Sequence, residues 1–353
     1  MTIDQKSKLL LFPRIGKFII VFFALAFIVV GIRAYQLYNY IFQENVKTEF
    51  ILIIPDNATF EQVTDSLITN DVLHNYKAFN WVSNKKNYKL TVKPGRYLFK
   101  IGMNTNQLVN MLRGGLQQPV NVTFNNIRFK EDLAGKVSVY IQADSISIIN
   151  LFYDEEKIEK YGFTPETFRA MFIPNTYEFF WTTSAEDFAD RMKAEYNNFW
   201  NETRKKQASE INLTPVEVTI LASIVQSETA KKDELKRIAG LYLNRLKRGQ
   251  LLQADPTVKY AVGDFSLKRI LNSHLDIESP YNTSKYAGLP PGPINFPEVT
   301  TIDAVLNFEK HTYIYMCAKE DFSGYHNFAS TLAQHNRNAA LYRTALNSNR
   351  IWK

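Results

Sequence analysis

The chain has 353 residues, of which 45% are hydrophobic and 22% are charged. This composition excludes a disordered, collagen-like or low-complexity protein, because such chains lack the apolar residues that a packed core requires. The length favours two domains of ordinary size over one. The net charge of +7 permits an anionic partner, but no basic block with interleaved aromatic residues marks a nucleic-acid-binding surface. Nucleic acid is therefore not expected as a partner.

The cysteine and histidine content gives little support for a metal site. Cys317 is the single cysteine, which excludes an intramolecular disulfide and a cysteine-based zinc cluster. The five histidines include no HExxH motif and no pair spaced by four residues, so a metal site is not predicted.

An uncharged apolar run, FIIVFFALAFIVVGI, occupies residues 18–32 between Lys17 and Arg33. As a helix these residues span about 22 Å, and the two flanking cations can extend toward the headgroups to match a hydrocarbon layer of about 30 Å. We therefore predict a transmembrane helix over residues 18–35. A cleaved signal peptide and a buried core helix are the alternatives. Residues 24–26 (ALA) resemble a cleavage site, but the apolar run continues beyond them, which favours an uncleaved anchor.

Basic residues predict the orientation of this helix. Lys6, Lys8, Arg14 and Lys17 precede it, whereas only Arg33 lies close behind it. Because cytoplasmic flanks carry the excess of Lys and Arg, residues 1–17 are expected to be a cytoplasmic tail and the remainder of the chain to be exported. The chain is then a single-pass membrane protein.

A small βααβ module is predicted over residues 49–115, after a juxtamembrane helix or linker at residues 36–48. Its strands are residues 50–54 and 96–101, and a short second helix is expected near residues 77–83. A module of this size is better suited to binding than to holding an elaborate active site.

Two capping boxes define helix starts in this module. Thr59 and Gln62 have the spacing that opens its first helix, and Asn104 and Gln107 have the same spacing before a third helix. Gly115 is a natural C-terminal stop for that third helix.

The remaining residues, 116–353, are predicted to be a mainly helical domain with one β-hairpin, so the fold class is α+β. Residues 119–152 weakly repeat the strand–helix–helix order of the first module. Ser330 is expected to cap a terminal helix that reaches about residue 346. The other predicted elements are helices over residues 186–200, 214–228, 233–247 and 267–271, and a hairpin over residues 311–329 that turns at residues 321–324.

The helix at residues 214–228 places a carboxylate where its apolar pattern calls for a leucine. Leu221, Ile224 and Val225 form a stripe whose next position is Glu228. Burial would raise the pKa of this carboxyl group and keep it protonated near neutral pH, as a general acid requires. The alternative is that the stripe ends at Val225 and that Glu228 is solvated or paired with Lys231 or Lys232, and the helix pattern alone favours this alternative.

A rigid loop follows at residues 279–295, with four prolines and two glycines in seventeen residues. Its aromatic, Asn and Thr side chains suit stacking on a sugar ring and hydrogen bonding to its hydroxyls. A plain connector with polyproline character is the alternative.

Four sequence blocks follow one another over the second half of the chain: LASIVQSETA (221–230), YLNRLKRGQLLQADPTVKYAVG (242–263), SPYNTSKYAGLPPGPI (279–294) and GYHNFASTLAQHN (324–336). Together they resemble the YceG-like family of membrane-anchored endolytic murein transglycosylases. The βααβ module is similar to the LysM-like subdomain of that family, so residues 49–115 are expected to be LysM-like and residues 116–353 to be the catalytic domain. With the apolar helix, the resemblance covers nearly the whole chain.

The resemblance implies cleavage of the β-1,4 bond between N-acetylmuramic acid (MurNAc) and N-acetylglucosamine (GlcNAc) in peptidoglycan glycan strands, with formation of 1,6-anhydro ends. It places the enzyme in the bacterial inner membrane, beside peptidoglycan synthases as possible partners, and requires no cofactor. The family's catalytic acid corresponds to Glu228. Many relatives carry a second glutamate two residues earlier, where this chain has Gln226.

Ten further residues are expected from the resemblance to position the substrate, with a purely structural hydrogen-bonding role as the equal alternative for each. They are Asn244, Arg245, Gln253, Asp255, Thr257, Tyr281, Asn282, Thr283, His326 and Phe328.

A single carboxyl group is enough for this chemistry. Ordinary glycosidases need two carboxyl groups, but attack by the sugar's own 6-hydroxyl supplies a tethered nucleophile. The rival functions are a hydrolytic muramidase with Asp255 or another carboxylate as the second group, and a non-enzymatic peptidoglycan-binding scaffold.

Overall fold

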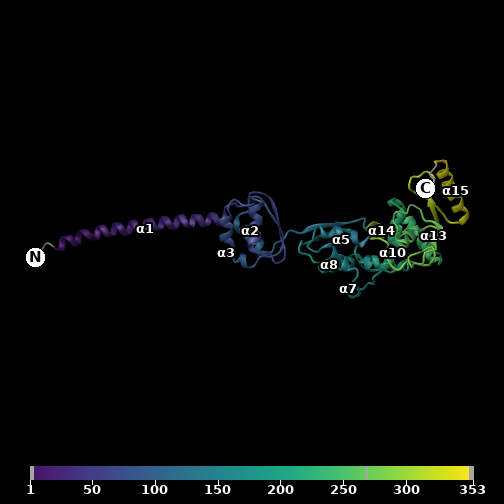
Figure 1. Cartoon of the computed structure of the whole chain (residues 1–353), viewed down its shortest axis with the longest axis horizontal. Helices are drawn as coiled ribbons and strands as arrows, with labels where there is room; N and C mark the ends of the chain where they lie inside the picture. Colours follow the sequence, from purple (N-terminus) through teal and green to yellow (C-terminus); the bar gives the residue numbers. More distant parts are fainter. Residues whose placement is uncertain (1–3, 268, 350–353) are drawn as a thin grey trace. The chain divides into compact units, whose positions relative to one another are not determined.

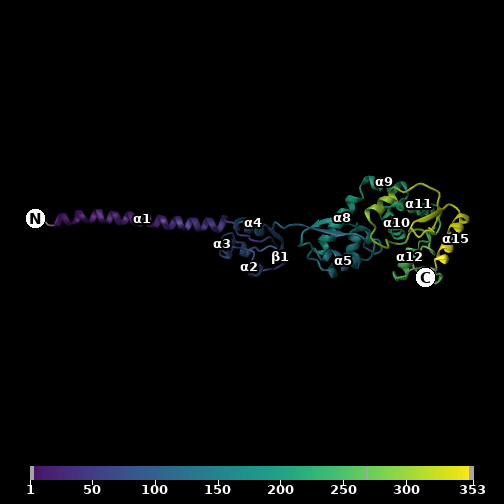
Figure 2. The same ribbon diagram turned by 90° about the horizontal axis from the view of Figure 1, so that it is seen from above.

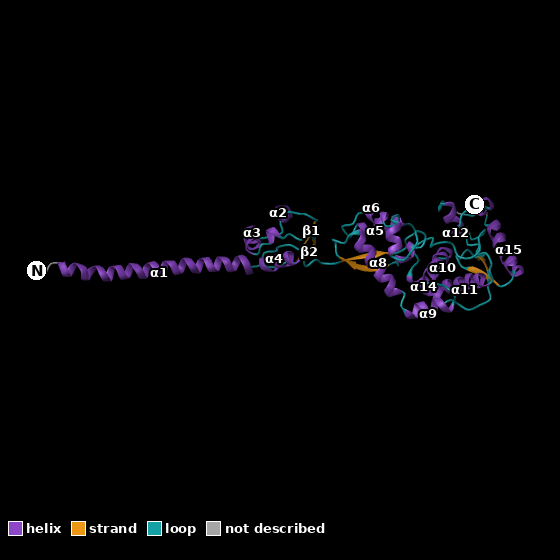
Figure 3. Ribbon diagram, turned by 90° about the horizontal axis from the view of Figure 1, so that it is seen from below, coloured by secondary structure: helices purple, strands orange, loops and turns teal. Residues whose placement is uncertain are grey.

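The structure is a computed structural model that describes residues 4–267 and 269–349, with side chains described from Gly16 onward. Its internal contacts divide the chain into two compact units. Unit 1 comprises residues 1–120 and 180–182, and unit 2 comprises residues 121–179 and 183–353. The strands form three separate two-stranded sheets, β1-β2, β3-β4 and β5-β6 (Figure 3).

Unit 1 begins with a long helix, α1 (Asp4–Phe42), drawn in purple in Figure 1. Residues 16–42 of this helix are long and apolar enough to cross a membrane, with a mean hydropathy of 2.5 and no buried side chains in the apolar window. The helix continues through residues 36–42, so only the residues after Phe42 connect it to the next strand. That connection is itself structured, because Val46 forms a β-bridge with Leu73.

The remainder of unit 1 has the predicted strand–helix–helix–strand order (Figure 3). Strand β1 pairs antiparallel with β2, from Phe50 opposite Phe99 to Ile54 opposite Gly95. Alternate residues of β1 face the core, because successive strand side chains point to opposite faces. The elements of unit 1 after α1 are β1 (Phe50–Ile54), α2 (Phe60–Thr69), α3 (Tyr76–Lys85), the 3-10 helix η1 (Tyr88–Leu90), β2 (Gly95–Phe99) and α4 (Thr105–Gly114).

Both predicted capping boxes are confirmed. The Thr59 side chain accepts a hydrogen bond from the backbone of Gln62, whose own side chain accepts one from the backbone of Thr59. Asn104 and Gln107 make the same reciprocal pair at the start of α4. Gly115 ends α4 with φ of 70°, a left-handed conformation that glycine adopts without steric cost.

Unit 2 starts with the order that residues 119–152 predict, a strand followed by two helices. Its mainly helical character is confirmed, although strand β4, which pairs with β3, was not predicted. The elements of unit 2 before its central helix are β3 (Val120–Phe124), α5 (Lys130–Ser138), α6 (Ser145–Asn150), α7 (Glu155–Lys160), the 3-10 helix η2 (Phe168–Met171), β4 (Asn175–Phe179), α8 (Ala185–Phe199) and α9 (Glu202–Glu210).

The central helix of unit 2 is α10 (Pro215–Glu228), which packs against α9, α11, α12 and α14. Figures 2 and 3 show α10 and α11 side by side. The elements after α10 are the 3-10 helix η3 (Lys232–Glu234), α11 (Leu235–Lys247), α12 (Asp255–Val262), α13 (Asn272–Leu275), α14 (Val299–Leu306), β5 (Tyr315–Ala318), β6 (His326–Ala329) and α15 (Leu332–Ser348).

Two predicted element boundaries are wrong. The described residues at 267 and 269–271 are not helical, and the short helix α13 begins at Asn272. The terminal helix is capped by Thr331, which accepts a hydrogen bond from the Gln334 backbone, and not by Ser330. The Ser330 hydroxyl instead lies 2.7 Å from that of Thr312, a partner far away in sequence that a local capping pattern cannot reveal.

Two helical glycines of unit 2 offer a matched test of its packing. A Cβ atom on Gly240 in α11 would overlap the Glu309 carbonyl oxygen and lie 2.8 Å from Nε2 of His311, whereas nothing lies within 4 Å of a Cβ on Gly135 in α5. We expect Gly240→Ala to lower the free energy of unfolding by about 1–3 kcal/mol. Gly135→Ala should raise it by about 1 kcal/mol, since alanine favours a helix interior. Urea unfolding of both variants tests this, and equal effects would contradict it.

Candidate active site

Helix α10 carries Glu228 at its last position. Its start is fixed by Thr214, whose side chain accepts a hydrogen bond from the Glu217 backbone while the Glu217 carboxylate accepts one from Thr214 N–H at 2.7 Å. Residues 218–225 are all buried, so the helix is enclosed on every side and not on one stripe alone. At Thr229 the backbone becomes extended, which ends the helix directly after Glu228.

The Glu228 carboxyl group is half-buried and is held by one hydrogen bond. The hydroxyl of Tyr242, a buried residue of α11, donates to Glu228 Oε1. The pKa of Glu228 is raised to about 7, chiefly by burial and to a smaller extent by the nearby charge of Asp255, while the Tyr242 hydrogen bond and Lys259 oppose the shift. Among the described residues, Glu228 has no salt bridge to Lys231 or any other cation. The group is therefore a carboxylic acid that exchanges its proton near neutral pH.

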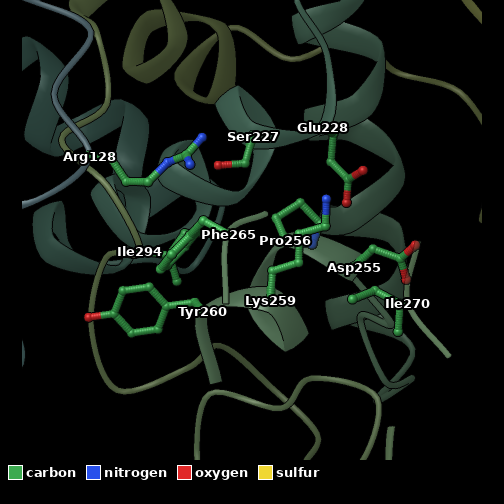
Figure 4. A pocket seen from close by; sticks show the side chains of 10 residues that line it. All are labelled: Arg128, Ser227, Glu228, Asp255, Pro256, Lys259, Tyr260, Phe265, Ile270 and Ile294. Carbon is green, nitrogen blue, oxygen red and sulfur yellow. The ribbon is translucent and has the colours of Figure 1, made fainter. Parts of the chain in front are cut away.

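Three cavities of unit 2 share Glu228 in their walls. The first, about 250 Å³, is shown in Figure 4, where Arg128 lies on the left and Glu228 and Asp255 on the right. The second, about 650 Å³, also includes Arg128 and Ser227. The third, about 480 Å³, includes Tyr242 and Asp255. Cavities of this size are typical of ligand sites, and Glu228 lies where all three meet.

Four of the ten expected positioning residues line these cavities. Asp255 borders the first and the third, and Arg245, Gln253 and His326 border the third. Partial desolvation raises the pKa of Asp255, although the residue keeps exposed surface, and Lys259 opposes the shift.

Arg245 lines the third cavity, but its guanidinium group is engaged in hydrogen bonds within the protein. Its guanidinium donates to the carbonyl oxygens of Leu251 and Ile314, each at 2.8 Å, and to the side-chain oxygen of Gln253. Gln253 has φ of 52°, which non-glycine residues seldom adopt and which often occurs at functional sites. Arg245 thus holds the strained turn that leads into Asp255.

Four other expected residues belong to the scaffold around the site. The hydroxyls of Thr257 and Thr283 are buried 2.7 Å from each other, and Thr283 also accepts a hydrogen bond from the Ala254 backbone. The Asn282 side chain donates to the carbonyl oxygens of residues 275 and 277. Asn244 donates in the same way to those of residues 311 and 313. The two threonines thus hold the segment between Gln253 and α12, while the two asparagines brace neighbouring loops.

The two expected aromatic residues are half-buried. The Tyr281 ring lies 4.7 Å from that of Tyr260, which lines the first cavity. The Phe328 ring lies 6.3 Å from that of His326 and 5.7 Å from that of Tyr313. Both rings therefore adjoin cavity-lining residues without themselves lining the three cavities.

Gln226 fixes a wall of the second cavity. Its side-chain oxygen accepts hydrogen bonds from the Glu298 backbone at 2.6 Å and from the Thr301 hydroxyl at 3.1 Å. Glu298 in turn accepts one from the backbone of Asn126 at 2.8 Å. The amide of Gln226 thus connects α10 to the start of α14. Because residue 226 is a glutamine, Glu228 supplies the carboxyl group in this last turn of α10.

Sequence reasoning did not single out several residues around Glu228. Tyr242 belongs to the apolar pattern of the helix at residues 233–247, although a buried tyrosine hydroxyl there calls for a polar partner. Arg128 comes from a segment one hundred residues upstream, and no local pattern indicates its place in the site. Lys259 and Ser227 lie inside recognised blocks but were not distinguished there.

Comparisons with known proteins agree on one family. A family model described as YceG-like matches residues 52–341. The chain is 28% identical over 321 residues to an endolytic murein transglycosylase of Bacillus subtilis, covering 86% of this chain and 88% of that protein. It is 26% identical over 330 residues to an endolytic murein transglycosylase of Streptococcus pneumoniae, covering 84% of this chain and 59% of that protein. A crystal structure of a yceG-like protein from Listeria monocytogenes matches with a TM-score of 0.53 at 26% identity, covering 82% of this chain and 98% of that chain.

The raised pKa of Glu228 predicts a pH-dependent stability. In the unfolded chain this carboxyl group has a pKa near 4.5, and in the folded chain near 7. The folded state therefore binds the proton more tightly, and the free energy of unfolding should fall by roughly 3 kcal/mol as pH rises from below 4.5 to above 7. Glu228→Gln removes this pH-dependent contribution to the free energy of unfolding. The difference in free energy of unfolding, variant minus wild type, should therefore be more positive at pH 8 than at pH 5. Urea unfolding of the full chain in detergent at the two pH values measures it, and an equal difference at both would contradict it.

Proposed function

This chain belongs to the YceG-like family, and from that premise we propose that it is an endolytic murein transglycosylase, a lyase that cuts peptidoglycan glycan strands. The observation that carries the proposal is the Glu228 carboxyl group, which lines all three cavities and whose pKa burial raises to about 7, so that a large fraction is protonated near neutral pH. Two curated relatives with similarity over most of this chain bear that name.

The reaction we propose uses Glu228 twice. Its proton passes to the glycosidic oxygen as the bond between C1 of MurNAc and O4 of GlcNAc breaks. The 6-hydroxyl oxygen of the same MurNAc then bonds to C1, and its proton returns to Glu228. The products are a free 4-hydroxyl on GlcNAc and a 1,6-anhydro-MurNAc end, and no water is consumed. The tethered hydroxyl replaces the second carboxyl group of ordinary glycosidases.

The cavities support cleavage within a strand. The first and third cavities share Glu228 and Asp255, while the second shares Glu228 and Arg128 with the first. Sugars can therefore occupy cavities on more than one side of the proton donor, as an endolytic cut requires. The Tyr242 hydroxyl orients the carboxyl group toward this junction.

A hydrolytic muramidase is the second candidate, and the position of Asp255 favours it. Asp255 borders two of the three cavities together with Glu228 and offers a second carboxyl group to activate water. The two reactions differ by one water molecule in the mass of their products.

We also propose that α1 anchors the enzyme in the bacterial inner membrane with its N-terminus in the cytoplasm. Residues 16–42 span about 40 Å as a helix, which exceeds a hydrocarbon layer of about 30 Å. Basic residues concentrate before the apolar run, as at a cytoplasmic flank. The βααβ module of unit 1, in the role of a LysM-like subdomain, would then hold glycan close to the membrane and favour newly made strands.

The central test is the product of cleavage. Full-length protein incubated with uncrosslinked glycan strands should release fragments that end in 1,6-anhydro-MurNAc, as read by mass spectrometry. Glu228→Gln should lower the rate by about 10²–10⁴-fold while glycan binding persists. Asp255→Asn should still give anhydro products. Hydrolysed ends that depend on Asp255 would instead establish the muramidase.

The pH profile tests the hydrogen bond from Tyr242. Because the protonated form of Glu228 is the proton donor, kcat/KM should fall as pH rises through about 7. Tyr242→Phe removes a hydrogen bond that lowers the pKa of Glu228, so the alkaline limb of the profile should move to higher pH. An unchanged limb would show that Glu228 does not control it.

A further inference from the structure

Glu234 is a buried carboxylate that the proposed reaction does not use. It ends the 3-10 helix η3, six residues after Glu228, and is only 4% exposed. A buried carboxylate is costly unless its oxygens are hydrogen-bonded, so its partners indicate what it does.

Both oxygens of Glu234 are directed to one residue of strand β6. Oε1 accepts a hydrogen bond from the backbone N–H of His326 at 3.0 Å, and Oε2 lies 2.9 Å from Nδ1 of the same imidazole ring. The Thr229 hydroxyl makes a weaker contact with Oε2 at 3.5 Å. This two-point attachment fixes both the backbone and the ring of His326 relative to the turn that follows Glu228.

The hydrogen bond to Glu234 also determines which ring nitrogen of His326 is available to a ligand. A carboxylate can only accept, so Nδ1 of His326 carries the hydrogen, and in the neutral form of the ring Nε2 then has the free lone pair. No side chain or backbone group of the described residues is hydrogen-bonded to Nε2. The His326 side chain is 15% exposed and lines the third cavity together with Glu228 and Tyr242.

We propose that Glu234 is a positioning residue that holds His326 so that its Nε2 accepts a hydrogen bond from a sugar hydroxyl in the cavity beside Glu228. This inference rests on the proposed function and specifies one contact of the glycan in the third cavity.

The surroundings favour a neutral hydroxyl over an ion as the ligand. The carboxylates of Glu234 and Asp255 disfavour an anion near His326. The described residues contain no group of three or more His, Cys, Asp or Glu side chains that could hold a metal ion. A neutral hydroxyl donor matches a single lone-pair acceptor, and glycan strands present such hydroxyls on every sugar.

The first measurement is the steady-state cleavage of uncrosslinked glycan strands by the full-length protein in detergent. Glu234→Gln should raise KM about tenfold, the size of one lost hydrogen bond, with little change in kcat. Asp233→Asn is the matched control. Asp233 is the adjacent residue of η3, is exposed, and accepts only a 3.4 Å contact from the Tyr325 hydroxyl, so its KM should equal that of the wild type.

A second variant separates a substrate contact from a purely structural attachment. In His326→Asn the side-chain amide can still donate to Glu234, as Nδ1 does, but nothing replaces Nε2. We expect this variant to fold with wild-type thermal stability and to show the same increase in KM as Glu234→Gln. Combining the two substitutions should add little further, because both remove the same contact.

Each outcome has a definite meaning. A wild-type KM in His326→Asn, or fully additive effects in the double variant, would overturn the role assigned to Glu234 and His326 while leaving the transglycosylase proposal intact. If the wild-type protein releases no anhydro fragments although Glu234 and His326 are unaltered, the proposed function fails, and the inference fails with it. The two failures are therefore distinguished by the wild-type reaction alone.

Discussion

The site depends on keeping one carboxyl group protonated inside a folded chain. Glu228 ends a helix whose residues 218–225 are buried, and burial of its carboxyl group disfavours the charged form. A group in such a setting lowers the stability of the fold when it ionises. The Tyr242 hydroxyl limits this effect, because it donates to the carboxyl oxygen without adding a charge.

The polar residues near Glu228 mostly support the loops that form the cavities. Arg245 holds the turn at Gln253 by donating to backbone carbonyl oxygens on two segments. The hydroxyls of Thr257 and Thr283 join the start of α12 and the residue before it to the rigid loop at residues 279–295. Buried polar groups need hydrogen-bond partners, so the identity of such a side chain is constrained by its structural hydrogen bonds as well as by any contact with substrate. This is why a family motif identifies a site as a whole without assigning a role to each of its residues.

Local signals predicted helix starts well where the partners lie within a few residues. The capping boxes predicted at Thr59 and Asn104 both form, because each depends on groups only three positions apart. Predictions failed where a distant partner intervened. The Ser330 hydroxyl lies beside that of Thr312, and the helix begins one residue later at the Thr331 cap. Strand β4 was likewise missed, since its partner β3 lies about fifty residues earlier.

The sequence by itself determined the apolar helix α1, the βααβ order of unit 1 and the unusual position of Glu228 on an apolar helix, because all three depend on periodicity along one segment. The helix pattern could not show whether that carboxyl group is solvated or enclosed. Enclosure comes from α11, α12 and α14, and from the loops of residues 125–128 and 294–298, which meet only when the chain is folded. The tertiary structure alone therefore decided the protonation of Glu228, the partner Tyr242 and the pairing of Glu234 with His326, since each requires atoms that are far apart in sequence to come within a few ångströms.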